Sequence, residues 1–76
     1  MAVPLNCIVT RATQAFIFVD FLFNKKWHKG AIHVSKWRER TYISDISQYV
    51  TIGEEIMAYA LNYDEAHSNW VLTCRL

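Results

Sequence analysis

The segment Ala15–Phe21 (AFIFVDF) constrains the fold of this chain most strongly. Almost all of its residues are β-branched or aromatic, and such residues favour strands. Side chains alternate across a strand, so every second residue shares a face. The predicted inward face holds Ala15, Ile17, Val19 and Phe21, and the outward face holds Phe16, Phe18 and Asp20. The charge of Asp20 marks the second face as the one that meets water.

Four other segments have strand composition, and two of them begin directly after the glycines of the chain, Gly30 and Gly53. The predicted strands are Leu5–Thr10, Ala31–Ser35, Glu54–Tyr63 and Asn69–Cys74. Their predicted inward residues are apolar throughout and include Ile32, Val34, Ile56, Ala58, Ala60, Trp70, Leu72 and Cys74. Between the third and fourth strands, residues 42–50 predict a short helical turn capped by Ser44.

The length of 76 residues predicts one domain over residues 1–76. A domain this small buries only about 60% of its unfolded surface, so it needs a well-closed apolar core. The 53% hydrophobic content supplies that core and argues against disorder. The longest strictly apolar run, Ala15–Val19, is too short to span a membrane, and the amino-terminal residues lack the pattern of a secretory signal. We therefore expect an intracellular protein, cytoplasmic or nuclear, with Cys7 and Cys74 as reduced core thiols.

Three motifs in order resemble a known RNA-binding family. GAIHVS (residues 30–35) is similar to the Gly-Leu-Val-His-Ile-Ser segment of the domain repeated in the largest protein of the bacterial small ribosomal subunit, the S-one-type OB domain. IVTRATQAFIFVDF (8–21) resembles its first two strands, and IGEEIMAYALNYDEAHSNWVLTC (52–74) resembles its last hairpin. The resemblance implies a five-stranded antiparallel Greek-key OB barrel, with a short helix between strands three and four.

The same resemblance implies a binding face. The family binds RNA through aromatics of the second strand, the histidine of the third strand and basic residues nearby. Phe18 falls on one aromatic position and His33 on the histidine, while Phe16 lies beside Ala15, which occupies the other aromatic position. The chain also departs from the family: Asn69 stands at a commonly basic position, and Cys7 and Phe16 stand where glycines are usual.

Residues 25–40 hold six basic side chains against one acid, Glu39. The basic residues are Lys25, Lys26, Lys29, Lys36, Arg38 and Arg40, and they flank Trp27 and Trp37. Basic residues interleaved with aromatics suit a nucleic-acid backbone together with its bases. The alternative is that the two tryptophans cover the barrel ends and the charges serve only solvation.

A second resemblance covers residues 21–55. This connection is similar to the amino-terminal domain of the alpha subunit of eukaryotic translation initiation factor two, which also has a basic run after its third strand. Arg38 stands at the position of the regulatory phosphoserine of that family. A substrate of the kinases of that factor is therefore not expected, and a mimic of the domain remains an alternative.

These observations predict a non-enzymatic module that binds single-stranded RNA. The predicted binding residues are Phe16, Phe18, His33, Lys25, Lys26, Lys36, Arg38 and Arg40. The sequence has no nucleophile elbow, phosphate-cradling glycine loop or HExxH motif, and no CxxC spacing, so we expect no catalysis, cofactor or metal. Two alternatives remain: an OB domain that uses its aromatic face for a protein partner, and a mimic of the translation factor domain.

Overall fold

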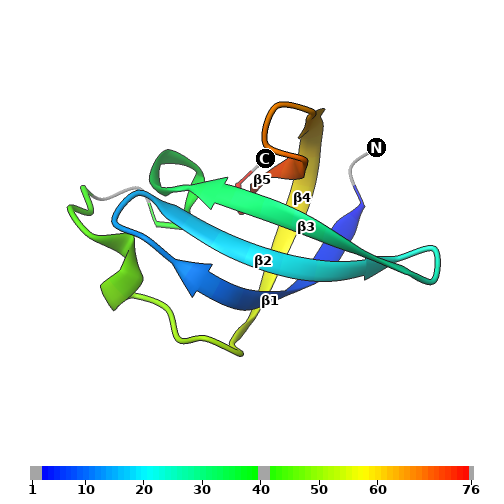
Figure 1. Cartoon of the computed structure of the whole chain (residues 1–76). Helices are drawn as coiled ribbons and strands as arrows, with labels where there is room; N and C mark the ends of the chain where they lie inside the picture. Colours follow the sequence, from blue (N-terminus) through cyan, green and yellow to red (C-terminus); the bar gives the residue numbers. More distant parts are fainter. Residues whose placement is uncertain (1–2, 40–41, 76) are drawn as a thin grey trace.

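Five strands close into a barrel in the order β1-β2-β3-β5-β4 (Figure 1). The structure is a computed structural model that describes residues 3–39 and 42–75. The strands are β1 (Pro4–Ala12), β2 (Phe16–Phe23), β3 (Lys26–His33), β4 (Glu55–Asp64) and β5 (Asn69–Thr73). The predicted five-stranded OB barrel is confirmed.

One pair of neighbouring strands, β3 and β5, is parallel, and we call this pairing the parallel seam of the barrel. β1 pairs antiparallel with β2 and β4, β2 with β3, and β4 with β5, whereas β3 pairs parallel with β5. This follows from the path of the chain, because β4 runs antiparallel to β1 and the hairpin to β5 then reverses direction again. The parallel pairing joins three residue pairs, from Gly30 opposite Trp70 to Ile32 opposite Leu72.

The β2–β3 hairpin is longer than the sequence predicted. The third strand was expected over Ala31–Ser35, but β3 begins at Lys26 and β2 continues to Phe23. Only Asn24 and Lys25 lie between them, and both have positive φ, 52° and 64°. Two left-handed central residues match the twist of a tight hairpin, although Asn-Lys lacks the glycine that usually marks such a turn. The hairpin projects beyond the rest of the barrel on the right of Figure 1.

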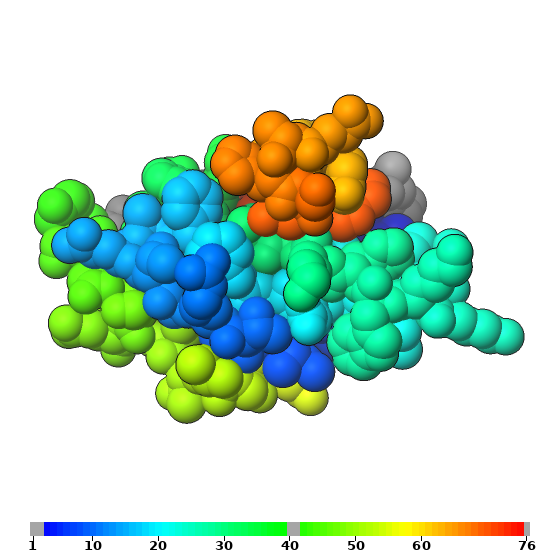
Figure 2. All heavy atoms as spheres, viewed as in Figure 1, coloured from blue at the N-terminus to red at the C-terminus, as the bar shows by residue number. Residues whose placement is uncertain are grey.

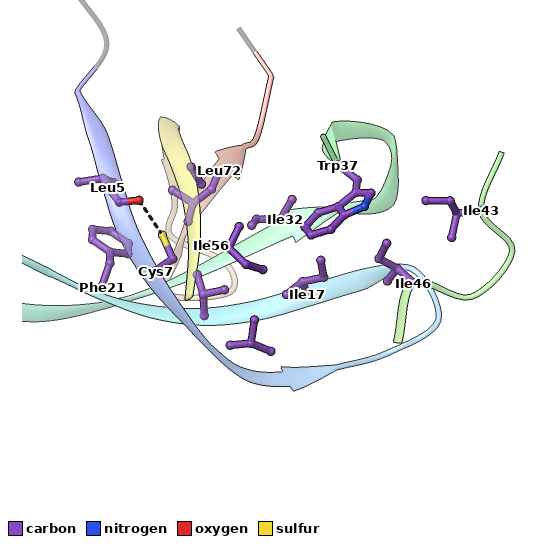
Figure 3. Packing of buried hydrophobic residues seen from close by; sticks show 13 residues of the cluster. Leu5, Cys7, Ile17, Phe21, Ile32, Trp37, Ile43, Ile46, Ile56 and Leu72 are labelled. Atoms are coloured by element: carbon purple, nitrogen blue, oxygen red, sulfur yellow. Dashed lines mark hydrogen bonds between the residues drawn. The ribbon is translucent and has the colours of Figure 1, made fainter. Parts of the chain in front are cut away.

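Inward side chains of all five strands form one core. The inward assignment of Ile17, Val19 and Phe21 is confirmed, since each is at most 3% exposed. Trp37 is 1% exposed and lies across one barrel end between Ile32 and the segment that carries Ile43 and Ile46 (Figure 3). Of the two tryptophans expected either to bind or to cover the barrel ends, Trp37 covers an end. Trp27, on the hairpin, is 62% exposed.

The expected helix between the third and fourth strands is a single 3-10 turn, η2 (Ile46–Gln48). Its cap is Asp45 rather than Ser44, because the Asp45 carboxylate accepts hydrogen bonds from the Ser47 backbone N–H at 3.1 Å and from the Ser47 hydroxyl at 2.5 Å. A further 3-10 turn, η1 (Val34–Lys36), directly follows β3. Val34, expected inward in the third strand, is therefore half-buried in η1.

One face assignment on β5 was wrong, and two residues expected inward are less buried than predicted. Ala60 lies opposite the buried Leu72 and lines a pocket with Leu5, Phe21 and Trp70, so it faces inward at the open end of the barrel, where it stays exposed. On β5, the expected outward Thr73 is buried, and its hydroxyl donates to the Arg75 carbonyl at 2.7 Å. Trp70, expected inward with Leu72, is only half-buried.

Both cysteines are free thiols. Cys7 is fully buried as expected, whereas Cys74 is half-buried. Burial, and secondarily the neighbouring Cys74, raises the pKa of the Cys7 thiol to about 11. Burial likewise raises the pKa of Cys74. Since thiolates are the reactive form, both side chains serve as packing groups at neutral pH.

Gly30 permits the close approach of β3 and β5. It points inward, where a Cβ atom would lie 2.5 Å from Leu72 Cδ1 and 3.0 Å from Leu72 Cγ. Leu72 is fully buried in a close-packed core, so it can move away only by displacing its neighbours. A glycine is therefore required where the parallel seam closes.

We expect Gly30→Ala to lower the free energy of unfolding by about 1–3 kcal/mol, the usual cost of overpacking. Urea denaturation measures this change. In a Leu72→Val background, which removes the nearest methyl group, the same substitution should cost less. Equal costs in both backgrounds would contradict the clash with Leu72 as the origin of the effect.

Candidate functional site

The outer face of β2 and β3 carries the predicted aromatic residues. Phe16 lies directly opposite His33, Phe18 opposite Ala31, and Asp20 opposite Lys29, so all six side chains share one face. Phe16 is 39% exposed and Phe18 is half-buried outside the core. The predicted outward assignment of Phe16, Phe18 and Asp20 is confirmed.

The aromatic rings of this face contact one another. The ring centroids of Phe16 and Phe18 lie 6.0 Å apart with 28° between the ring planes. The His33 ring meets Phe16 edge-on, at 4.9 Å between centroids and 71° between planes. Arg11 places its guanidinium carbon 4.2 Å from the Phe18 centroid. These contacts limit ring motion and hold a cation above an aromatic plane.

Arg11 was not among the residues predicted from the sequence. Counting alternate residues from the buried Val9 would place Arg11 inside the barrel. Instead, the register of β1 against β2 shifts between Val9 and Arg11, and this irregularity brings Arg11 opposite Phe18 on the outer face. Nothing in the local sequence marks the irregularity, so only the structure reveals this cation.

His33 is held in a defined tautomer. Its Nδ1 accepts a hydrogen bond from the Ser35 backbone N–H at 3.1 Å and lies 2.8 Å from the Ser35 hydroxyl. A backbone N–H can only donate, so Nδ1 of the neutral ring carries no hydrogen. The hydrogen is then on Nε2, which makes His33 a hydrogen-bond donor on the exposed face.

A groove of about 390 Å³ runs between this face and the turn that joins β4 to β5. In Figure 2 that turn, coloured orange, stands above β2 and β3. One wall of the groove comes from β1, β2 and β3, and the other from the turn and the start of β5. The lining residues are Thr10, Arg11, Phe18, Val19, Asp20, Lys29, Gly30, His67, Ser68 and Asn69. Asn69 falls at the position that is commonly basic in the resembling family, whereas the local sequence does not place His67 and Ser68 at the site, since they lie far along the chain from β2.

The β4–β5 turn is stabilised by its own side chains. The Asp64 carboxylate lies 2.7 Å from Nδ1 of His67 and also accepts from the Ala66 backbone N–H at 3.0 Å. The hydrogen bond from His67 is the main reason that the pKa of Asp64 is below its ordinary value. Ser68 follows with a positive φ of 53°. These contacts hold the turn that forms the second wall of the groove.

The structure does not bring the basic residues of segment 25–40 together. Lys25 and Lys26 lie at the hairpin tip, and Lys26 is opposite Phe23, on the hairpin face that points away from Phe18. Lys36 lies in η1, three residues beyond His33. Arg38 stacks on Trp37 at 4.6 Å and lies 4.0 Å from Glu54. Arg40 lies outside the described residues.

A second pocket, of about 260 Å³, lies under the hairpin at the opposite barrel end from Trp37. Its lining is almost entirely apolar: Val3, Leu5, Phe21, Phe23, His28, Ala60 and Trp70. It lacks a Lys or Arg lining residue, so it suits a polyanion less well than the groove does. Over residues 3–39 and 42–75, no three His, Cys, Asp or Glu side chains are grouped so as to hold a metal ion. No helix in that part of the chain is long and apolar enough to cross a membrane.

The strand order, the parallel β3–β5 seam and the 3-10 turn between β3 and β4 together define an OB fold. Among solved structures, the chain is similar to a chain in the crystal structure of the a/eIF2alpha–aDim2p–rRNA complex from Pyrococcus horikoshii OT3, with a TM-score of 0.77 and 18% sequence identity. The predicted likeness in fold to the S-one-type OB domain and to the amino-terminal domain of the translation factor is confirmed.

The match covers 97% of this chain and 43% of the other, so the barrel spans less than half of that chain. No protein-family model matches the sequence, and no curated protein matches it. The similarity therefore concerns the fold.

We expect His67→Ala to raise the pKa of Asp64 toward its ordinary value, because the main group that lowers it is lost. A lowered folded-state pKa stabilises the protein at a pH above the unfolded-state value, and this stabilisation is lost as pH falls through the folded-state value. As pH is lowered, the variant should therefore lose the contribution of Asp64 to the free energy of unfolding at a higher pH than the parent protein does. NMR titration of the carboxyl carbon measures the change, and His33→Ala, which alters a histidine outside the turn, should leave the Asp64 titration unmoved.

Proposed function

We propose that the chain is a non-enzymatic module that binds single-stranded RNA on the outer face of β2 and β3. The observation that carries this proposal is the contact between Arg11 and Phe18 beside the groove, with Phe16 and His33 continuing the same face. A polyanion with planar bases needs cations and exposed aromatic rings within one surface, and this face supplies both.

Stacking accounts for the preference for single strands. Phe16 presents an exposed ring, and the Phe18 ring beside it opens to a base when the Arg11 guanidinium moves onto a phosphate. The bases of a duplex are already stacked on their neighbours. Stacking of this kind contributes roughly 1–3 kcal/mol per base and tolerates any base, because each has a π-face. His33 adds a hydrogen-bond donor at the far end of the same ring series.

Cations along the face provide the phosphate contacts. Arg11 and Lys29 line the groove, and Lys36 lies beyond His33. Together they describe a path along the outer face, whereas the hairpin lysines lie to one side of it. Each phosphate neutralised on a single strand contributes about −0.7 to the slope of log affinity against log salt concentration.

The similar solved structure gives further support. It is a complex that contains rRNA, and one of its chains shares the fold of this barrel over nearly the whole length of the present chain. OB barrels commonly bind oligonucleotides through the face of strands two and three. The aromatic groups of this chain lie on that same face.

Phe18→Ala should weaken binding of a short single-stranded RNA by about 5- to 150-fold, the equivalent of one lost stacking contact. The salt slope should stay nearly constant, because stacking releases no counterions. The variant should stay folded, since Phe18 lies outside the core. NMR titration at two salt concentrations measures both quantities. Unchanged affinity in a folded variant would overturn the stacking model and favour a face used for a protein partner.

Lys29→Ala should weaken binding and flatten the salt slope by about 0.7, because one phosphate contact is lost. Lys26→Ala is the matched control: it removes the same charge from the same strand, on the opposite face of the hairpin. Fluorescence anisotropy over a salt series compares the two variants. If Lys26→Ala has the larger effect, the RNA path runs over the hairpin tip and not through the groove.

The fold similarity also favours a second candidate function, a mimic of the initiation factor domain that occupies a kinase of that factor. Arg38 is exposed and cannot accept a phosphate at the position that matches the regulatory serine. Such a mimic should inhibit phosphorylation of the alpha subunit by its kinase in a purified assay, without being phosphorylated itself. Absence of inhibition at a large excess of this chain would exclude the mimic.

A further inference from the structure

Asp20 is a carboxylate on an otherwise cationic and aromatic surface. It is half-buried in the groove, with Phe18 two residues before it and Lys29 opposite. No described residue forms a hydrogen bond or an ion pair within 4.0 Å with its side chain. A carboxylate in this position repels phosphates, so its presence at an RNA surface favours a contact with a base instead.

The edges of the four bases differ in what they offer a carboxylate. An ionised carboxylate accepts hydrogen bonds through two oxygens and donates none. The Watson–Crick edge of guanine presents two adjacent donors, N1–H and the N2 amino group. Adenine and cytosine each present one amino donor next to a ring-nitrogen acceptor, and uracil presents one N–H between two carbonyl oxygens. Only guanine therefore satisfies both oxygens of Asp20 at once.

The geometry of the strand places Asp20 at the edge of a stacked base. Residues two apart on one face of a strand are about 7 Å apart. A base that takes the place of the Arg11 guanidinium over the Phe18 ring, and leaves Arg11 to contact a phosphate, therefore directs an edge toward Asp20. Asn69 lines the opposite wall of the same groove. Its side-chain amide offers a donor that suits the O6 acceptor of guanine.

We propose that the groove selects guanine, with Asp20 as the residue that determines this specificity. The inference rests on the proposed RNA binding and adds the identity of the preferred base. It concerns the base that stacks on Phe18 and leaves the other stacked positions tolerant of sequence.

Four RNA pentamers that differ only in the central base, UUGUU, UUAUU, UUCUU and UUUUU, test the proposal by fluorescence anisotropy. We expect UUGUU to bind about 5- to 150-fold more tightly than the other three, which is the discrimination of one bidentate contact. Asp20→Asn should remove this preference, and it should strengthen binding of UUUUU because a charge that repels phosphate is lost. Glu55→Gln removes an equal charge on β4 outside the groove, so it should leave the preference intact.

The outcomes separate this inference from the proposed function. Equal affinity of the parent protein for all four RNAs, still dependent on Phe18, overturns the guanine inference and leaves RNA binding standing. A guanine preference that persists in a folded Asp20→Asn variant overturns the role of Asp20. Absence of binding to any of the four RNAs overturns both proposals.

Discussion

The barrel closes where β3 and β5 approach each other, and the contact between Gly30 and Leu72 makes that approach possible. A side chain at position 30 would collide with a fully buried leucine and separate the two strands. Without that seam, β5 would lose its place beside β3, and the turn before it would no longer overhang the outer face. The groove therefore depends on a close contact inside the barrel, on the reverse side of the sheet from the proposed ligand.

The large side chains on the outer face of β2 and β3 lie outside the core that holds the barrel together. Phe16 is 39% exposed and does not belong to the buried core. Contacts with Phe18 and His33 instead restrict the ring and keep it available to a ligand. Because these side chains are already restricted in the free protein, they lose less conformational entropy when a ligand binds.

The positions of the charged side chains matter more for this surface than the net charge of the chain. The chain has a net charge of only +1, so its overall field attracts a polyanion weakly. Arg11 on β1 and Lys29 on β3 nevertheless line the groove, and Asp20 lies on β2, the strand between them. In the proposed RNA complex, this mixture of signs suits recognition of one kind of base, because the cations would contact the backbone and the carboxylate would disfavour base edges that lack two donors.

The sequence by itself determined the number and order of the five strands, the inward and outward faces of β2, and the shared face of Phe18 and His33. These features follow from alternation, which is a local property of a strand. Tertiary structure alone decided that Arg11 faces outward and that His67 and Ser68 join the groove. The first depends on a register shift between β1 and β2, and the second on closure of β5 against β3. Both depend on pairing between segments distant in the chain, which the residues of one segment do not encode.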